Sequence, residues 1–138
     1  MKVLLDTNVL LDVLLNREPF YADAAKLWSL AETGKIHGCV SALSFTNVYY
    51  VARHHQGALD ARQMLRKTRD IFTTILCDAQ IVNQAIDSDI SDFEDAVQYF
   101  SSVHTAADCI ITRNKRDFPK DAPPALTPHE FLATYSFE

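Results

Sequence analysis

Glycine is scarce in this chain of 138 residues, which contains only three. Gly34, Gly38 and Gly57 are isolated from one another, so the chain has neither a G-x-G-x-x-G turn nor a P-loop. Nucleotide recognition through a glycine-rich turn is therefore excluded. Long apolar runs are also missing: stretches such as Val3–Leu5 fall far short of the roughly 18 residues that a membrane span needs. We expect no membrane anchor, no export signal and a cytoplasmic location.

The few cysteines exclude a disulfide framework. Cys39, Cys77 and Cys109 lie far apart, form no C-x-x-C motif, and each falls in or beside an expected strand. We interpret them as small core side chains in a reducing compartment. The chain also lacks G-x-S-x-G and has no motif-placed Cys–His pair, so acyl transfer is not supported.

Charge is abundant but segregated, although the net charge is only −5. Between Asp70 and Thr112 there are eight acids and no lysine or arginine, and nine of the thirteen bases fall in segments 53–69 and 113–120. Acids gathered without counter-charge repel one another, and a bound cation would relieve that repulsion. The basic segments could hold a phosphate backbone.

Short strand-like runs alternate with helical patterns along the chain. The residues predict strands at 2–5, 36–40, 72–76 and 109–111, with a possible edge strand at 125–126. Helical periodicity fills the segments between them, and Thr127–Glu130 predicts a capping box for a last helix. This alternation indicates an α/β fold with a mostly parallel sheet of four or five strands and helices on both faces. We expect a single domain over residues 1–138.

Polar residues follow the expected parallel strands where those strands end. Asp6 follows the first strand and Asn114 follows the fourth, so both should lie at one sheet edge. Asp92 and Asp95 share a face at the start of the helix that leads into the fourth strand, and Asn47 adds a second amide. Such an all-oxygen set suits Mg²⁺ or Mn²⁺, which activates water and stabilises phosphoryl charge. Phosphodiester hydrolysis is the natural reaction.

Each of these acids also has a plainer interpretation. An aspartate after a strand often only caps a helix, and acids in a first turn complement the helix dipole. Asp117 could reach the site through water, whereas Asp12, a helix turn or more beyond Asp6, is expected on the surface. His37, His104 and His129 show no metal-ligand spacing.

Three stretches together resemble the PIN domain of VapC-type toxin ribonucleases. They are Leu4–Asp12 (LLDTNVLLD), Asp92–Ala96 (DFEDA) and Thr112–Phe118 (TRNKRDF), and the likeness covers nearly the whole chain, including Ser41–Ser44. The resemblance implies a three-layer α/β/α domain that cuts RNA with Mg²⁺ or Mn²⁺. It also implies a homodimer and an antitoxin partner that inserts a segment near the acidic groove.

The resemblance also implies roles for single residues. Asp6 is similar to the family's first acid, Asp95 to its third, and Asn114 to the position after the fourth strand that is acidic or Asn. Thr112 resembles the hydroxyl beside that position. Asn47 departs from the pattern because the family often has a glutamate there, and an amide offers a metal only a dipole.

The combined expectation is a metal-dependent endoribonuclease, the toxin of a toxin–antitoxin pair, with water as the nucleophile. Asp6, Asp95 and Asp92 are expected to bind the ion, with Asn114 completing or orienting its shell. The expected supporting residues are Thr7, Asn47, Thr112 and Asp117, and those expected to contact RNA phosphates are Arg53, Arg62, Arg66, Arg113 and Lys115.

Two other functions stay open at this stage. With amides at positions 47 and 114, the fold could bind RNA or a protein without cutting. Asp6 could also be the nucleophile of a phosphatase or phospho-acceptor. Asn8 weakens that alternative because a second carboxylate would be needed there to protonate the leaving group.

Overall fold

The computed structural model describes residues 1–137, which form five strands and seven helices. The strands are β1 (Lys2–Leu5), β2 (His37–Ser41), β3 (Thr73–Ile75), β4 (Cys109–Ile111) and β5 (Ala125–Leu126). The helices are α1 (Thr7–Leu14), α2 (Tyr21–Glu32), α3 (Ala42–Gln56), α4 (Ala58–Ile71), α5 (Ala79–Asp87), α6 (Phe93–His104) and α7 (Pro128–Thr134).

All strand pairs in the single sheet are parallel, in the order β3-β2-β1-β4-β5. In the central strand β1, Leu4 is in register with Cys39 on one side and with Ile110 on the other. The expected parallel sheet is confirmed, and its five strands include the predicted edge strand.

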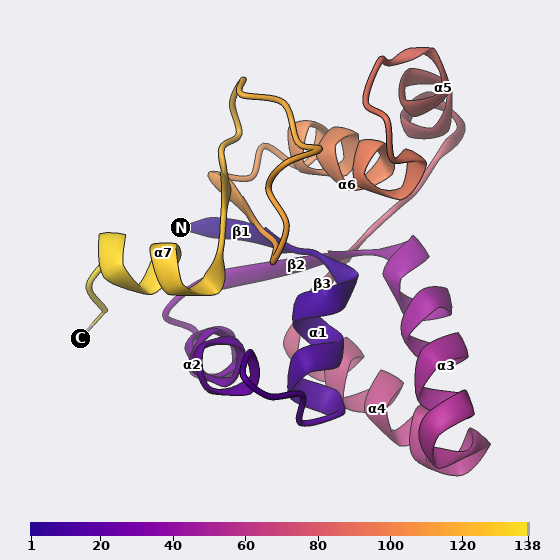
Figure 1. Ribbon diagram of the computed structural model, residues 1–138, viewed down its shortest axis with the longest axis vertical. Coiled ribbons are helices and arrows are strands. Elements are labelled where there is room, and N and C mark those ends of the chain that lie inside the picture. Colours follow the sequence, from indigo (N-terminus) through magenta and orange to yellow (C-terminus); the bar gives the residue numbers. More distant parts are fainter. Residues whose placement is uncertain (138) are drawn as a thin grey trace.

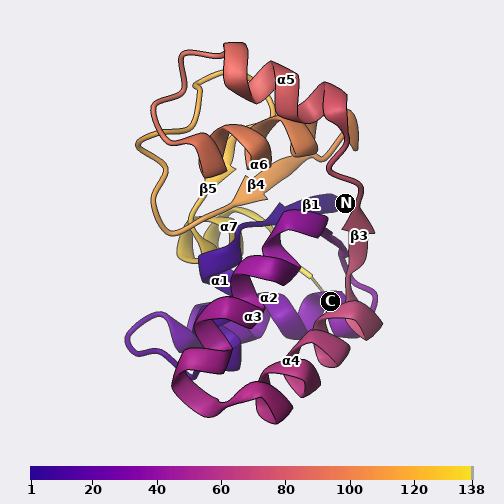
Figure 2. The same ribbon diagram turned by 90° about the vertical axis from the view of Figure 1, so that its right-hand side faces the viewer.

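Helices cover both faces of the sheet, as Figures 1 and 2 show: α5 and α6 lie on one side and α1 to α4 on the other. Side chains alternate between the faces, as they must in a strand. Val3 and Leu5 join the larger core with Phe131 of α7, whereas Leu4 packs on the opposite face with Cys39. The three-layer α/β/α architecture is therefore confirmed.

Three of the helices begin with a capping side chain at the edge of the sheet where the candidate site lies. The side chains of Asp6, Ser41 and Asp92 cap α1, α3 and α6, respectively. Thr127 and Glu130 form the predicted capping box of α7. Cys39 and Cys109 are buried with free thiols, as expected of core side chains. Within residues 1–137, no helix combines the length and apolarity that crossing a bilayer requires.

Candidate active site

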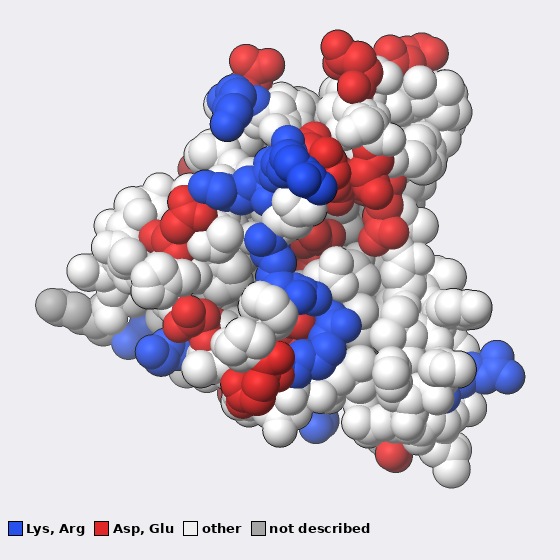
Figure 3. All heavy atoms as spheres, viewed as in Figure 1, with Lys and Arg blue, Asp and Glu red and all other residues white. Residues whose placement is uncertain are grey.

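An acidic pocket of about 440 Å³ opens where α1, α6 and the loop after β4 meet. Its lining residues are Asp6, Asn8, Phe20, Asp92, Glu94, Asp95, Thr112, Arg113, Asn114 and Asp117. Five of these ten are acids, and Figure 3 shows acidic side chains gathered beside a group of basic ones on this face. The sheet topology thus brings together acids that are up to 111 positions apart in the sequence.

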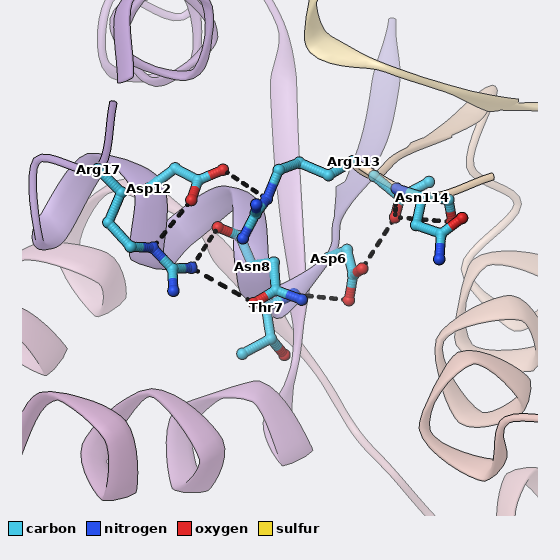
Figure 4. A network of polar contacts seen from close by, with 8 residues as sticks. Asp6, Thr7, Asn8, Asp12, Arg17, Arg113 and Asn114 are labelled. Atoms are coloured by element: carbon cyan, nitrogen blue, oxygen red, sulfur yellow. Dashed lines mark hydrogen bonds and ion pairs between the residues drawn. The ribbon is translucent and has the colours of Figure 1, made fainter. Parts of the chain in front are cut away.

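Asp6 is the most buried of the five acids that line this pocket, with only 6% of its surface exposed. Its Oδ1 accepts a hydrogen bond of 2.8 Å from the backbone N–H of Thr7. Its Oδ2 accepts one of 2.9 Å from Thr112 Oγ1, from the end of the neighbouring strand (Figure 4). Because a carboxylate oxygen has about two lone-pair sites, each oxygen keeps capacity for a further partner. Thr7 and Thr112 therefore fix the orientation of the Asp6 carboxylate.

A buried network of side chains lies behind Asp6 and joins three helices. Thr7 Oγ1 and Ser44 Oγ are 2.8 Å apart, and Gln98 Nε2 donates to Ser44 Oγ at 2.9 Å. Gln98 Oε1 has no hydrogen-bond partner in the described part of the chain. Gln98 is a site residue that no sequence motif indicates; its one signal is its position one helix turn after Asp95, on the same face of α6.

Asp92 and Asp95 line the pocket from the first turn of α6. Asp92 is exposed, and its Oδ1 accepts a 2.9 Å hydrogen bond from the backbone N–H of Asp95, so it caps the helix. Asp95 is half-buried. Asp92 therefore combines the plain capping role with a charge at the pocket rim.

Burial and mutual repulsion raise the pKa of both inner carboxyl groups. Desolvation is the main cause that raises the pKa of Asp6 to about 6, against the opposing hydrogen bonds from Thr112 and Thr7. Desolvation also raises the pKa of Asp95 to about 7, and the charge of Asp6 is the next contribution. The negative charges of Asp92 and Glu94 act on both groups. A cation in this pocket would offset the repulsion that the acids exert on one another.

The donor set fits a hard cation bound through few protein ligands. Within residues 1–137, no three histidine, cysteine, aspartate or glutamate side chains form a group that could hold a metal ion. Asp6, Asp92 and Asp95 thus line one pocket without forming a compact three-ligand cluster. Mg²⁺ usually keeps several waters and takes one or two protein carboxylates. Asp6 and Asp95 line the same pocket, and the charge of Asp6 acts on Asp95, so they are the two carboxylates from which such a site would be built.

The loop after β4 brings two more of the expected site residues to the pocket. Asn114 donates its backbone N–H to Thr112 Oγ1 at 3.3 Å and accepts from the Arg116 N–H through Oδ1 at 3.2 Å. Asp117 Oδ1 accepts a hydrogen bond of 3.4 Å from Ser91 Oγ. These contacts fix the shape of the loop, from which Asn114 and Asp117 line the pocket.

Asn47 is not among the residues that line the acidic pocket. It lies on α3 one helix turn after Ser44, whose hydroxyl belongs to the buried network behind Asp6. Asn47 is partly exposed, whereas Ser44 is buried beside Thr7 of α1. The two expected amides are thus separated: Asn114 reaches the pocket lining and Asn47 does not.

Asp12 is fully buried, so its expected surface position is wrong. Its Oδ1 is 3.0 Å from Arg17 Nε, and its Oδ2 is 3.0 Å from Arg113 Nε (Figure 4). Desolvation raises the pKa of Asp12, against the opposing charges of Arg113 and Arg17. The guanidinium carbon of Arg113 lies 4.1 Å from the ring centroid of Phe20. Asp12 thus holds Arg113 at the edge of the acidic pocket.

The other expected phosphate contacts lie outside the acidic pocket lining. Lys115 Nζ forms an ion pair of 2.7 Å with Glu130 Oε2. Arg62 and Arg66 line a separate pocket of about 500 Å³ beside α3 and α4. Arg53 is exposed near the end of α3. Of the five expected contacts, Arg113 alone lines the acidic pocket.

Comparison with known proteins identifies a shared domain and fold. A family model described as PIN domain matches residues 2–116. Among curated proteins, no significant match is found. A toxin–antitoxin complex from Klebsiella pneumoniae superposes with a TM-score of 0.68 at 21% identity, over 93% of this chain and 98% of that one.

Two further solved structures are similar. VapBC2 from Rickettsia felis, bound to a promoter DNA fragment, gives a TM-score of 0.65 at 15% identity, over 86% of this chain and 91% of that one. VapC20 from Mycobacterium tuberculosis is described as a sarcin-ricin loop cleaving toxin. It gives a TM-score of 0.69 at 11% identity, over 83% of this chain and 92% of that one. At these identities the likeness establishes the fold.

Proposed function

This chain belongs to the PIN domain family, and from that membership we propose that it is a metal-dependent endoribonuclease that hydrolyses phosphodiester bonds in RNA. One observation carries the proposal. Asp6 and Asp95, from the end of β1 and the start of α6, line the same pocket. Burial raises the pKa of both, and their charges repel. A site of this kind favours a divalent cation.

The residues of the pocket have distinct roles in this reaction. Asp6 and Asp95 hold the ion, and Thr7 and Thr112 fix the orientation of Asp6 through its two oxygens. A bound Mg²⁺ or Mn²⁺ supplies an activated water and neutralises charge on the phosphoryl group. Asp92, Asn114 and Asp117 line the rim, where they can orient water molecules.

Basic residues would position the RNA backbone. Arg113 is the one basic residue among those that line the acidic pocket, and its ion pair with Asp12 holds it in place. Arg53, Arg62 and Arg66 would contact phosphates farther along the strand. Lys115 would do so only by leaving Glu130, its ion-pair partner.

We place the protein as the toxin of a toxin–antitoxin pair in the cytoplasm, acting as a homodimer. Two of the similar solved structures carry toxin–antitoxin descriptions or names, and a third is described as a cleaving toxin. An antitoxin segment would then block the acidic pocket.

A cleavage assay tests the proposal. Purified protein with Mn²⁺ should cut single-stranded RNA, and a chelator should stop the reaction. Asp6→Asn and Asp95→Asn should each lower the rate by about a hundredfold or more, because one cation ligand loses its charge. Asp70→Asn, at an exposed ion pair with Arg69, is the matched control and should cut at the parental rate. Equal rates for the parent and both site variants would show that the proposal is wrong.

A binding module without catalysis is the second candidate. It is favoured by the amides at positions 47 and 114 and by the exclusion of Asn47 from the pocket lining. Calorimetry with Mn²⁺ separates the two. A nuclease should show a saturable ion site that Asp6→Asn removes, together with cleavage. RNA binding with neither property would support the module.

A further inference from the structure

A second pocket, of about 220 Å³, adjoins the acidic pocket, and Phe20 and Arg113 line both. Its other side is formed by Pro128 and His129 at the start of α7 and by Asp23 in the first turn of α2. We propose that this second pocket, called the base pocket below, binds one unpaired base of the RNA strand whose phosphate lies in the acidic pocket. This inference rests on the proposed function and adds to it a binding site for one base of the substrate, beside the acidic pocket.

The shared wall offers flat surfaces for stacking. The guanidinium carbon of Arg113 is 4.1 Å from the Phe20 ring centroid, so the two groups cover one face of each other. A base would stack on the part of Phe20 that stays exposed, which is 41% of the residue. Unpaired RNA bases stack on aromatic rings and on guanidinium planes. Asp12 holds the Arg113 end of the wall through its 3.0 Å ion pair. The stacking surface is therefore preformed.

The same pocket also has polar groups that could bind a base edge. His129 Nδ1 lies 3.5 Å from Asp23 Oδ2, and the imidazole is 83% exposed. A carboxylate accepts hydrogen bonds, and an imidazole can donate or accept one. Base edges carry both donors and acceptors. The base pocket is also smaller than the roughly 300–1,000 Å³ of sites for drug-sized ligands, which suits a single heterocycle.

Arg113 connects the two pockets chemically. Among residues 1–137, its only ion-pair partner is Asp12, whose Oδ2 lies 3.0 Å from its Nε without hydrogen-bond geometry. The two terminal nitrogens of its guanidinium have no hydrogen-bond acceptor in the described structure and remain for a phosphate. A nucleotide could thus place its base against Phe20 while its phosphate meets Arg113 and the acidic pocket. The stacking also holds the strand where five acids would otherwise repel it.

Binding without cleavage tests the base pocket. The protein carries Asp95→Asn, and the probe is a short, fluorescein-labelled, single-stranded RNA of mixed sequence in Mg²⁺. An abasic nucleotide replaces each nucleotide in turn, and fluorescence anisotropy gives the affinity. We expect base removal at one position to weaken binding about tenfold. Adding Phe20→Leu should reduce that loss to less than about twofold, because the stacking partner is already gone.

Controls separate stacking from general damage. Phe20→Tyr keeps an aromatic ring and should retain the position-dependent loss. Tyr50→Leu removes an aromatic side chain that is 78% exposed and lines neither pocket, so it should leave binding unchanged. A duplex of the same sequence should bind with no dependence on Phe20.

Two results would overturn the inference. One is base removal that has the same effect with and without Phe20→Leu at every position, which would leave the pocket to another occupant such as a protein side chain. The other is a duplex that binds as tightly as the single strand. Neither result bears on whether the parent cuts RNA, so failure of the base pocket and failure of the nuclease proposal are distinguishable.

Discussion

Asp12 is the residue that holds two arginines near the acidic pocket while being fully buried itself. It pairs with Arg17 and Arg113 at 3.0 Å each, and the two arginine side chains are 32% and 27% exposed. A buried carboxylate with two such partners is costly to remove, because the arginines then keep charges without a counter-ion. Arg113 also loses the group that holds it against Phe20.

Asp12→Asn should lower the free energy of unfolding by about 3 kcal/mol, because the cost of leaving Arg17 and Arg113 without a counter-ion exceeds the relief of the desolvation that raises the pKa of Asp12. Urea denaturation of parent and variant measures this loss. Asp70→Asn is the matched control, since the Arg69–Asp70 pair is 65% exposed on both sides, and it should change stability by less than about 0.5 kcal/mol. Similar values for the two variants would contradict the structural role of Asp12.

Asp95 should make the metal-free protein less stable as the pH rises. Its folded-state pKa is about 7, above the ordinary value of 3.8. The raised pKa means that the folded protein favours the protonated form of Asp95. The contribution of Asp95 to the free energy of unfolding is therefore fully present below about pH 4 and is lost as the pH approaches 7. Asp95→Asn should therefore exceed the parent in unfolding free energy by about 2 kcal/mol at pH 8, allowing for partial exposure, and match it near pH 4.

Denaturation in the presence of a chelator, repeated across this pH range, measures that difference. Asp89→Asn, at an exposed position outside the acidic pocket, should follow the parent at every pH. A gain for Asp95→Asn that is constant with pH would mean that its charge is not the cause.

At the scale of elements, β2 packs closely against the helical layer because Gly38 has no side chain. A Cβ on Gly38 would lie 2.5 and 2.7 Å from two ring carbons of Phe72 and 3.2 Å from the Ala31 Cβ. Phe72 is buried and packs edge-on against Trp28 at 4.9 Å, so its ring has little room to move. This contact sets how closely β2 approaches the segment between α4 and β3.

Gly38→Ala should cost about 2 kcal/mol of unfolding free energy through overpacking. Phe72→Leu in the same chain should recover part of that loss, so the double variant should be more stable than the sum of the two single changes predicts. Thermal or urea unfolding of the four proteins gives the coupling. Strict additivity would rule out the contact with the Phe72 ring as the cause.

Strand ends were predicted less accurately than strand centres. The sequence indicated strands at 36–40 and 72–76, whereas β2 spans His37–Ser41 and β3 spans Thr73–Ile75. Ile36 and Phe72 are buried although both lie outside the strands. Hydrophobic patterning reports burial, and it cannot separate a residue paired in the sheet from an apolar residue packed just beyond it. Caps are local, so the Thr127–Glu130 capping box was predicted correctly.

At the scale of the whole molecule, the fold concentrates negative charge at one edge of the sheet. The net charge is −5, and five acids line the acidic pocket. The family resemblance of the three sequence stretches is confirmed by the model that matches residues 2–116. A cation that binds only the folded chain should stabilise it by mass action.

Mn²⁺ should therefore raise the melting temperature at pH 8 by several degrees, since about 2.7 kcal/mol is gained at a hundredfold excess over Kd. The rise should be smaller at pH 5, where Asp6 and Asp95, with pKa values of about 6 and 7, are protonated. Differential scanning calorimetry measures both. Asp95→Asn should lose most of the shift and Asp70→Asn none of it; an undiminished shift in Asp95→Asn would place the ion elsewhere.

The sequence by itself determined the parallel sheet and the edge at which Asp6, Asp95, Thr112 and Asn114 meet. Local periodicity predicts the strands, and parallel strands necessarily end at the same edge. Tertiary structure alone decided the burial of Asp12 beside Arg113, 101 positions away, and the base pocket between Phe20 and His129. It also decided that Ser44 contacts Thr7 of α1 while Asn47 is absent from the acidic pocket lining. These features depend on the angles at which distant helices and loops pack, and no local pattern of residues encodes those angles.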